Sequence, residues 1–482
     1  MQSSVPYYDV IIVGAGISGI GAAYHLQEKC PGKTFTILEG RSTMGGTWDL
    51  FKYPGIRSDS DMYTLGFSFN PWIDDKAIAD GPAILQYIHD TAAKFGIDKK
   101  IQYKHKVKDA SWSDAQKCWT LTVSNDGIEQ TLQCGFLFMC SGYYNYEEGY
   151  LPEFPGYDDF KGKIVHPQFW DQNLDYKDKK VVIIGSGATA VTLVPEMAKM
   201  AEKVVMLQRT PTYVVTLPSK DKIALNLRKY LPEDTAYEVI RWKNILVSMG
   251  FYNAARTWPT QIKKLIQKGI SLQLGKDYDM RHFDPPYNPW DQRLCVVPDA
   301  DLFQSIKNGK VEVVTDTIKT FTEKGILLNS GKELEADIIV TATGLKLQLL
   351  GGMTMHINGE LAESSKGHVY RGMMISDVPN FALTVGYTNS SWTLKVDLSS
   401  HFVTRILNHM DKHGYKVCTP KFSGSELDSR PLLDFDAGYV KRAGSVLPKQ
   451  GAKSPWKVYQ NYLLDLLSLK VSDVDDGSLE YR

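Results

Sequence analysis

Short, uninterrupted apolar runs recur along the chain and alternate with longer stretches that repeat apolar side chains at helical spacing. Residues 10–13, 181–184 and 338–340 consist entirely of Val and Ile, a composition typical of parallel strands that are buried on both faces. Residues 82–95 carry an amphipathic helical pattern, whose apolar stripe would face a core. This alternation predicts an α/β fold. The apolar runs are far shorter than the ~20 residues that span a bilayer, so no transmembrane segment is expected.

The first of these strands leads directly into the glycine-rich sequence Gly-Ala-Gly-Ile-Ser-Gly, and a helical pattern follows. Gly14 permits a tight turn, Gly16 permits close approach of a pyrophosphate, and Gly19 permits close packing of the helix on the strand. A second strand ends in Glu39, near the spacing expected for a carboxylate that binds a ribose hydroxyl. The combination predicts a dinucleotide-binding unit. A glycine-rich turn beside a surface glutamate would leave the spacing unexplained.

A second strand, loop and helix repeat this order later in the chain. The loop comprises Gly185, Ser186, Gly187, Ala188, Thr189 and Ala190. The position that holds Glu39 in the first unit is occupied here by Arg209, followed by Thr210. A carboxylate there would repel a 2′-phosphate, whereas a guanidinium can bind it through a charge-assisted pair and Thr210 adds a hydroxyl. The second unit is therefore expected to prefer NADPH to NADH, the alternative being an Arg209 that is merely exposed.

Between the two loops lies a stretch with the spacing F-x-G-x-x-x-H-x-x-x-W-D. Its members are Phe160, Gly162, His166, Trp170 and Asp171. This stretch resembles the fingerprint of the Baeyer-Villiger monooxygenases, flavoenzymes that use FAD, NADPH and oxygen to insert one oxygen atom beside a carbonyl. Ordinary packing on a linker between two domains, with the histidine capping a backbone carbonyl, is the alternative interpretation.

The loop after the first unit, Gly-Gly-Thr-Trp-Asp-Leu-Phe-Lys-Tyr-Pro-Gly-Ile-Arg-Ser-Asp, resembles the FAD-binding loop of the ethionamide-activating branch of this family. By this resemblance, the residues that would touch FAD are Ser18, Glu39, Gly46, Thr47, Trp48, Asp49, Leu50 and Asp59. Arg57, Ser58 and Asp59 would face the nicotinamide, and Val107 would lie where a strand meets the adenine. Alternatively, Asp59 or Asp61 caps a helix that begins near Met62.

The resemblance also implies a catalytic arginine. A Pro-rich, aromatic segment contains Arg293, which matches the residue that reaches the reactive edge of the flavin in the family. A guanidinium stays protonated and can stabilise negatively charged oxygen adducts, and Asp59 would orient it. Gln292 stands where many relatives have a lysine, which removes one candidate contact to the 2′-phosphate. The alternative is an ordinary salt bridge from Arg293 to Asp291 or Asp299.

Two further features bear on the shape of the site. Segments 104–112, 119–124 and 130–133 alternate apolar and polar residues and predict a small β-meander that covers one face of the first unit. Residues 222–274 read as helices rich in aromatic and basic side chains, and an insertion of this size is expected to shape a substrate cavity. Because a basic, aromatic helix also suits a membrane surface, packing and peripheral membrane contact both stay open.

These landmarks divide the chain into five parts. They are an FAD-binding part over residues 1–145, an NADP-binding part over 146–221, a helical insertion over 222–290, a second NADP-binding part over 291–342, and a second FAD-binding part over 343–482. The return to the FAD-binding unit follows from an Ala-Thr-Gly turn after the strand at 338–340. The last part would include a C-terminal lid anchored by Trp456, or a fixed surface loop instead.

Composition narrows the remaining choices. Lys and Arg number 55 and Asp and Glu number 55, so the formal net charge is zero, which argues against a nucleic-acid partner. The six cysteines form no C-x-x-C pair, which argues against a zinc site and a dithiol redox centre and favours buried free thiols in a reducing compartment. The N-terminal residues lack the charged and apolar regions of a signal peptide. A cytoplasmic enzyme without a metal site is expected.

The resemblance extends over nearly the whole chain and implies two Rossmann-like units, one for FAD and one for NADPH. The implied reaction converts a ketone to an ester or lactone through a C4a-peroxyflavin, with S-oxygenation of sulfides or thioamides as a second activity. An N- or S-oxidising flavin monooxygenase without ketone activity is the nearest alternative. An NADPH-dependent flavin reductase and a flavin-binding sensor without enzymatic activity are further alternatives.

Overall fold

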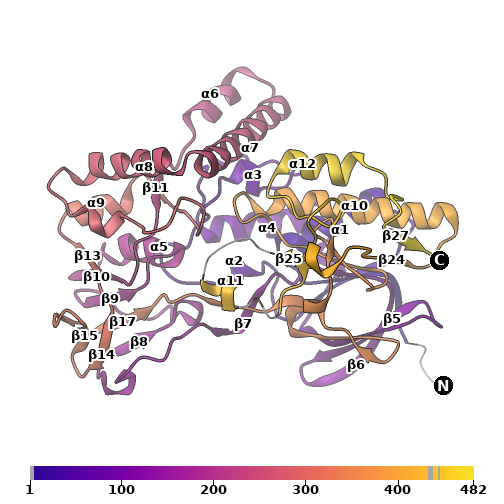
Figure 1. The fold of residues 1–482 in the computed structure, drawn as a ribbon, viewed down its shortest axis with the longest axis horizontal. Coiled ribbons are helices and arrows are strands. Elements are labelled where there is room, and N and C mark those ends of the chain that lie inside the picture. Colours follow the sequence, from indigo (N-terminus) through magenta and orange to yellow (C-terminus); the bar gives the residue numbers. More distant parts are fainter. Residues whose placement is uncertain (1–4, 433–437, 443, 445) are drawn as a thin grey trace.

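The computed structural model of the 482-residue chain describes residues 5–432, 438–442, 444 and 446–482. Two β-sheets with packed helices lie side by side, and a group of helices extends above them (Figure 1). The expected α/β architecture with two Rossmann-like units is confirmed by these two sheets and their glycine-rich turns. Residues 1–4, part of the stretch considered for a targeting signal, lie outside the described residues.

The larger sheet has nine strands within the described part of the chain. They are β1 (Tyr7–Val13), β2 (Phe35–Glu39), β3 (Ile101–Tyr103), β4 (His105–Ser113), β5 (Cys118–Asn125), β6 (Ile128–Met139), β19 (Thr354–Ile357), β20 (Glu360–Leu361) and β23 (Phe381–Leu383). Their order is β20-β19-β4-β5-β6-β1-β2-β3, with β23 beside β6. Helices α1 (Ile17–Lys29) and α10 (Trp392–His413) share the core that contains Val10, Ile20 and Phe402.

The β-meander differs from the expectation in one respect. Strands β4, β5 and β6 are antiparallel neighbours, as predicted, but β6 is one continuous strand whose second half pairs in parallel with β1. The meander therefore extends the sheet of the first unit instead of forming a separate layer over one of its faces. The segment predicted at 130–133 is therefore part of a longer strand, which continues through Gly135 to Met139 because its second half is hydrogen-bonded to β1.

The smaller sheet has five strands within the described residues. They are β8 (Lys163–Val165), β9 (Lys180–Ile184), β10 (Lys203–Gln208), β13 (Val311–Thr315) and β17 (Ile338–Thr341), all paired in parallel. Alternate residues of β9 face opposite sides. Val181 and Ile183 pack with helices α5 (Ala188–Met197) and α9 (Asp301–Lys307). Val182 and Ile184 pack with an antiparallel sheet formed by β14 (Ile318–Thr322), β15 (Gly325–Leu328) and β16 (Glu333–Glu335).

The chain passes between the two sheets on a two-stranded ribbon. Strand β7 (Tyr144–Gly149) leads away from the larger sheet, and β18 (Leu345–Leu347) leads back to it. The two strands pair antiparallel, Tyr144 with Leu347 and Gly149 with Leu345. The larger sheet therefore takes strands from both ends of the chain. The boundaries of the five-part division given above stay a prediction.

Three helices form the insertion. They are α6 (Lys222–Tyr230), α7 (Glu233–Thr257) and α8 (Pro259–Leu274). Helix α7 packs against α3 (Met62–Leu65) beside the larger sheet, whereas α8 packs against α9 beside the smaller one. The insertion thus bridges the two units. Among the described residues, no helix is both long and apolar enough to cross a membrane.

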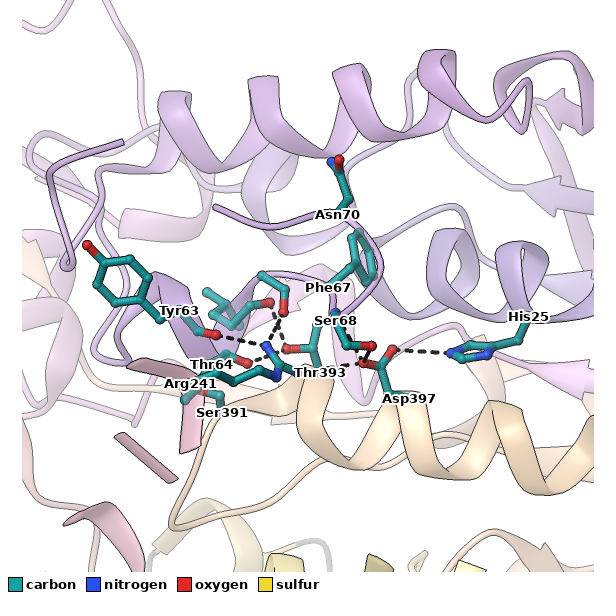
Figure 2. Close-up of polar contacts among 12 residues, drawn as sticks. His25, Tyr63, Thr64, Phe67, Ser68, Asn70, Arg241, Ser391, Thr393 and Asp397 are labelled. Carbon is teal, nitrogen blue, oxygen red and sulfur yellow. Dashed lines mark hydrogen bonds and ion pairs between the residues drawn. The ribbon is translucent and has the colours of Figure 1, made fainter. Parts of the chain in front are cut away.

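A buried charge network anchors α7 to the larger-sheet unit (Figure 2). Arg241, only 4% exposed, donates hydrogen bonds to the backbone oxygens of Tyr63 and Gly66, each at 2.8 Å. Its guanidinium lies 3.6 Å from Asp397 of α10, which in turn lies 3.4 Å from His25 of α1. Burial alone would raise the pKa of Asp397, but His25, Arg241 and a neighbouring serine hydroxyl lower it below its ordinary value. Three helices therefore depend on one carboxylate.

We predict that replacing Arg241 by Met lowers the free energy of unfolding by about 3–5 kcal/mol, because Asp397 loses its guanidinium partner while remaining buried. Urea denaturation followed by circular dichroism measures this difference. The matched control is Arg281→Met, which removes a guanidinium that is 88% exposed and paired with Asp279 on the surface. Equal stabilities of the two variants would contradict the anchoring role of Arg241.

Candidate active site

A large cavity opens along the carboxyl ends of the central strands of the larger sheet. Its volume is about 540 Å³, within the range of cofactor sites in proteins. Twelve of the residues predicted from the sequence line it: Gly14, Gly16, Ser18, Glu39, Gly46, Thr47, Trp48, Leu50, Ser58, Asp59, Val107 and Arg293. Residues far apart in the sequence are thus brought together around a single space.

The glycine loop forms the floor of this cavity. Gly14 has φ +104°, and a Cβ atom there would lie 2.6 Å from the carbonyl oxygen of Cys140. A Cβ atom on Gly19 would lie 1.9 Å from the oxygen of Gly14, so Gly19 packs the helix on the loop and does not face the cavity. Gly16 begins α1 without a side-chain cap, and the first turn contains no acidic residue. The backbone N–H groups of this turn are therefore available to an anion.

Glu39 is buried at the end of β2, with 7% of its surface exposed. One carboxylate oxygen accepts a hydrogen bond from the N–H of Ala15 at 2.8 Å, and the other accepts one from the N–H of Arg41 at 2.9 Å. Burial raises the pKa of Glu39 in spite of these bonds. Each oxygen has a further lone pair, so a ribose hydroxyl can still be bound.

Like Gly19, the predicted residues Asp49 and Arg57 do not line the cavity. Asp49 pairs with Arg41 at 2.7 Å and with Lys52 at 3.1 Å, which stabilises the loop from outside. Arg57 pairs with Asp301 of α9 at 2.5 Å. The opposite charge on the smaller-sheet unit holds the Arg57 side chain away from the cavity, and a direct nicotinamide contact by Arg57 gains no support from this geometry.

Arg293 and Asp59 face each other across the cavity wall. The guanidinium Nη2 lies 2.6 Å from Asp59 Oδ2, and the side chains are 40% and 25% exposed. The alternative partners of Arg293 are engaged elsewhere, because Asp291 pairs with Arg256 at 2.7 Å and Asp299 accepts a hydrogen bond from the N–H of Ser219. The expected Arg293–Asp59 pair is present. Asp61, and not Asp59, caps α3 by accepting a hydrogen bond from the N–H of Thr64 at 3.0 Å.

Aromatic residues outside the predicted set of site residues supply much of the remaining wall. Tyr143, Tyr144 and Tyr146 line the cavity, as do Tyr387 and Trp392. Trp392 stacks on Tyr143 with 5.1 Å between ring centroids, and its indole N–H donates to Ser18 Oγ at 2.8 Å. The signal was present in the sequence, because three tyrosines in four positions directly follow the buried end of β6.

The second glycine loop has the same construction. Gly185 has φ +136°, and a Cβ atom there would lie 2.4 Å from the oxygen of Ala342. Gly187 begins α5 without a side-chain cap and has open space beside it. Ser186 Oγ donates to the carbonyl oxygen of Thr210 at 3.1 Å, and Arg209 is exposed at the end of β10. The second glycine loop is therefore accessible to a ligand, and the positively charged side chain of Arg209 lies at its edge.

None of the fingerprint residues lines the cavity. Phe160 is buried in the core of the smaller sheet, and a Cβ atom on Gly162 would lie 2.4 Å from the oxygen of Asp337. His166 occupies the space beside Gly149 of β7, where a Cβ atom would meet its ring at 2.1 Å. Burial lowers the pKa of His166, and its Nδ1 accepts a hydrogen bond from the N–H of Gln168. The neutral ring therefore packs the crossing point.

The last two fingerprint residues differ from each other in burial. Trp170 is half-buried against the core of the smaller sheet, whereas Asp171 is exposed and pairs with Lys163 at 3.1 Å. The packing role considered for this stretch is consistent with Phe160, Gly162, His166 and Trp170, whereas Asp171 forms a surface ion pair.

Within the described residues, no group of three or more His, Cys, Asp or Glu side chains is arranged to hold a metal ion. All six cysteines are free and buried, as expected. The expected anchor of a lid, Trp456, is 7% exposed and packs on Tyr370 and Phe422, away from the residues that line the cavity.

Comparisons with known proteins agree with this geometry. A sequence model described as "Flavin-binding monooxygenase-like" matches residues 8–350, more than half of the chain. The chain is 55% identical to the FAD-containing monooxygenase EthA of Mycobacterium tuberculosis, over 98% of each protein. It is 50% identical to the probable FAD-binding monooxygenase AlmA of Acinetobacter baylyi, over 98% of this chain and 96% of that protein. The crystal structure of cyclohexanone monooxygenase from Rhodococcus bound to NADP+ shares the fold with a TM-score of 0.79 and 17% identity, over 99% and 100% of the two chains.

We predict that Gly14→Ala weakens dinucleotide binding at the first loop about tenfold or more, because a side chain at this φ is strained and its Cβ meets the carbonyl of Cys140. Titration of the apoprotein with FAD, followed by flavin fluorescence, measures the affinity. Gly32→Ala is the matched control, since Gly32 has open space around it. An unchanged affinity in Gly14→Ala would show that the loop does not hold the ligand.

Proposed function

This chain belongs to the flavin-binding monooxygenase-like family, and we propose that it is a Baeyer-Villiger monooxygenase that uses FAD, NADPH and O2 to convert ketones to esters or lactones. S-oxygenation of sulfides or thioamides is part of the proposal. The observation that carries it is the Arg293–Asp59 ion pair on the wall of a cofactor-sized cavity. The overall reaction consumes one ketone, one O2, one NADPH and one proton and yields one ester, one water and one NADP+.

The cavity fits FAD. The uncapped first turn of α1 would hold the pyrophosphate, Glu39 the ribose, and the wall around Val107 the adenine. The segment that contains Thr47, Trp48 and Leu50 would lie along the opposite side. FAD, when bound, would take a hydride from NADPH and pass two electrons to O2, so that one oxygen atom can enter the substrate. The residues of the chain bind this group, orient it and exclude water.

The second loop fits NADPH. The first turn of α5 has no acidic residue and no side-chain cap, so its N–H groups would bind the pyrophosphate. Arg209 would bind the 2′-phosphate, since an exposed guanidinium forms charge-assisted hydrogen bonds to phosphate oxygens. With Gln292 in place of a lysine, Arg209 would carry most of this recognition. We assign the smaller-sheet unit to NADPH and the larger-sheet unit to FAD on these grounds.

Arg293 would act directly on the reacting atoms. Negative charge develops on the oxygen atoms during oxygen insertion, and a guanidinium held in place beforehand stabilises that charge without reorganisation. Asp59 would orient Arg293 between turnovers, because the close charge-assisted contact between them restricts the side chain. The 40% exposure of the Arg293 side chain leaves it accessible from the cavity. The substrate would be a small molecule that enters beside this pair.

We predict that Arg293→Ala lowers ester formation about 100-fold or more, because a preorganised donor of this kind contributes roughly 3 kcal/mol to the barrier, while flavin reduction by NADPH largely survives. A ketone and sulfide panel with NADPH consumption and product mass measured together tests both halves. Arg256→Ala is the matched control, since it breaks the neighbouring pair with Asp291 outside the cavity.

Three results of this panel would redirect the proposal. Near-parental ester formation by Arg293→Ala would remove the catalytic assignment. Sulfoxide without ester from the parent enzyme would indicate an N- or S-oxidising monooxygenase. NADPH oxidation without any oxygenated product would indicate a reductase.

We predict that Arg209→Ala lowers kcat/KM with NADPH by about tenfold to 100-fold, since a hydrogen bond to a charged group contributes ~1.5–3 kcal/mol. The value for NADH, which has no 2′-phosphate, should hardly change, so the same variant supplies its own control. Steady-state oxidation of the two cofactors gives the ratio. An equal loss of kcat/KM with NADPH and with NADH would place Arg209 outside the 2′-phosphate site.

A further inference from the structure

A second buried ion pair adjoins the cavity and has no part in the mechanism given above. Lys395, in the first turns of α10, and Asp465, in α12 (Tyr462–Leu466), are each 3% exposed. Their side chains approach to 2.8 Å, measured from Nζ to Oδ2. The hydroxyl of Tyr387 donates to the same Asp465 oxygen at 2.7 Å. One carboxylate oxygen therefore receives both an ammonium and a phenol.

Tyr387 connects this pair to the cavity. Its side chain lines the cavity that also contains Arg293 and Asp59, although the residue is only 7% exposed. Its ring packs with Leu394 of α10 and with Ile245 of the insertion helix α7. The residue before Ile245, Asn244, donates to Asp61 at 2.8 Å, two positions from Asp59. Tyr387 thus lines the same cavity as the Arg293–Asp59 pair.

The loop that carries Tyr387 is fastened to the C-terminal segment at several points. The N–H and hydroxyl of Thr388 both donate to the side-chain oxygen of Gln460, at 3.1 and 3.2 Å. The side-chain amide of Asn389 donates to the backbone oxygen of Gln460 at 2.9 Å. The contact to Asp465 differs from these because its acceptor is a buried carboxylate that is also paired with Lys395 of α10, and burial makes such an ion pair strongly dependent on both partners.

We propose that Lys395 and Asp465 are positioning residues which act through Tyr387, and that Tyr387 is a specificity-determining residue of the cavity wall. The pair fixes the position of the phenol ring, and the ring sets the width of the cavity that also contains Arg293. Neither Lys395 nor Asp465 touches the reacting atoms. The inference rests on the proposed function in that its substrate is a ketone, because selectivity between ketones is the property that a fixed ring controls.

The chemistry of the pair explains why it must be tested as a unit. Burial lowers the pKa of Lys395, and Asp465 opposes that shift. Burial, followed by the charge of Asp465, raises the pKa of Tyr387, so the phenol stays protonated and donates. Removing one charge alone would leave the other buried without a partner and endanger folding. Replacing both by apolar residues of similar size avoids this outcome.

Three variants separate positioning from stability. Tyr387→Phe removes the hydroxyl and keeps the ring. The double variant Lys395→Met/Asp465→Leu removes both charges and the acceptor. The triple variant combines the two. For each, the ratio of kcat/KM between a linear and a cyclic ketone is measured, together with thermal stability.

Tyr370→Phe is the matched control. The Tyr370 hydroxyl donates to Asp476 at 2.9 Å, beside Arg371 and in the same C-terminal segment, but Tyr370 does not line the cavity. It therefore removes the same kind of hydrogen bond at a comparable depth without reaching the site.

We expect the selectivity ratio to change about fivefold to tenfold in Tyr387→Phe and in the double variant, mainly through KM. The triple variant should change it no further, because the effects of coupled residues are not additive. Tyr370→Phe should leave the ratio unchanged. Additive effects, or equal ratios for Tyr387→Phe and Tyr370→Phe, would overturn the inference.

The parent enzyme distinguishes failure of this inference from failure of the proposed function. If the parent forms no ester from either ketone, the proposed function is wrong. The position of Tyr387 is then tested with the visible spectrum of bound FAD. A spectral shift that Tyr387→Phe and the double variant share, and that Tyr370→Phe lacks, supports the positioning role. The absence of a shift overturns it.

Discussion

Two ion pairs join the larger-sheet unit to the smaller-sheet unit of this protein, one on the cavity wall and one outside the cavity. Residues 57 and 59 lie in one loop of the larger-sheet unit, and each binds a charge of the other unit: Arg57 binds Asp301, and Asp59 binds Arg293. The loop carries a positive charge at residue 57 and a negative charge at residue 59, and the other unit carries the opposite charges. A shift of one unit along the other would therefore place like charges together. The arrangement of the cofactor cavity, the orientation of Arg293 and the approach of the second glycine loop all depend on this register.

Charge pairing also attaches the insertion helices to the larger-sheet unit. Helix α7 reaches the larger-sheet unit through Arg241, whose guanidinium satisfies two backbone oxygens as well as Asp397. Its next turn presents Ile245 to Tyr387 in the cavity wall. The helix is therefore both a structural bridge and a wall of the site. The C-terminal segment closes the wall from the other side through Asp465. Three segments from distant parts of the chain thus define one surface.

The sequence predicted the local features that depend on short-range rules. The glycine spacing and the β-branched strands predicted both Rossmann-like turns, and the acid at the end of β2 supported the first of them. Twelve predicted residues line the cavity. Features that depend on tertiary charge pairing were less predictable. Arg57 and Asp49 carry the right chemistry for a cofactor contact, yet each is held by an opposite charge outside the cavity. The wall formed by Tyr387 and the β7 tyrosines depends on which segments meet in space. The spacing of residues along the sequence does not predict these meetings.

The buried cysteines have a consequence for the durability of such a protein. Burial raises the pKa of Cys140 and of Cys295 to about 12, and Cys295 stands only two positions after Arg293. Since the thiolate is the nucleophile that attacks hydrogen peroxide, thiols held protonated at neutral pH react slowly. A flavin-dependent monooxygenase thereby keeps these two thiols, one of which lines its cavity, resistant to oxidative damage.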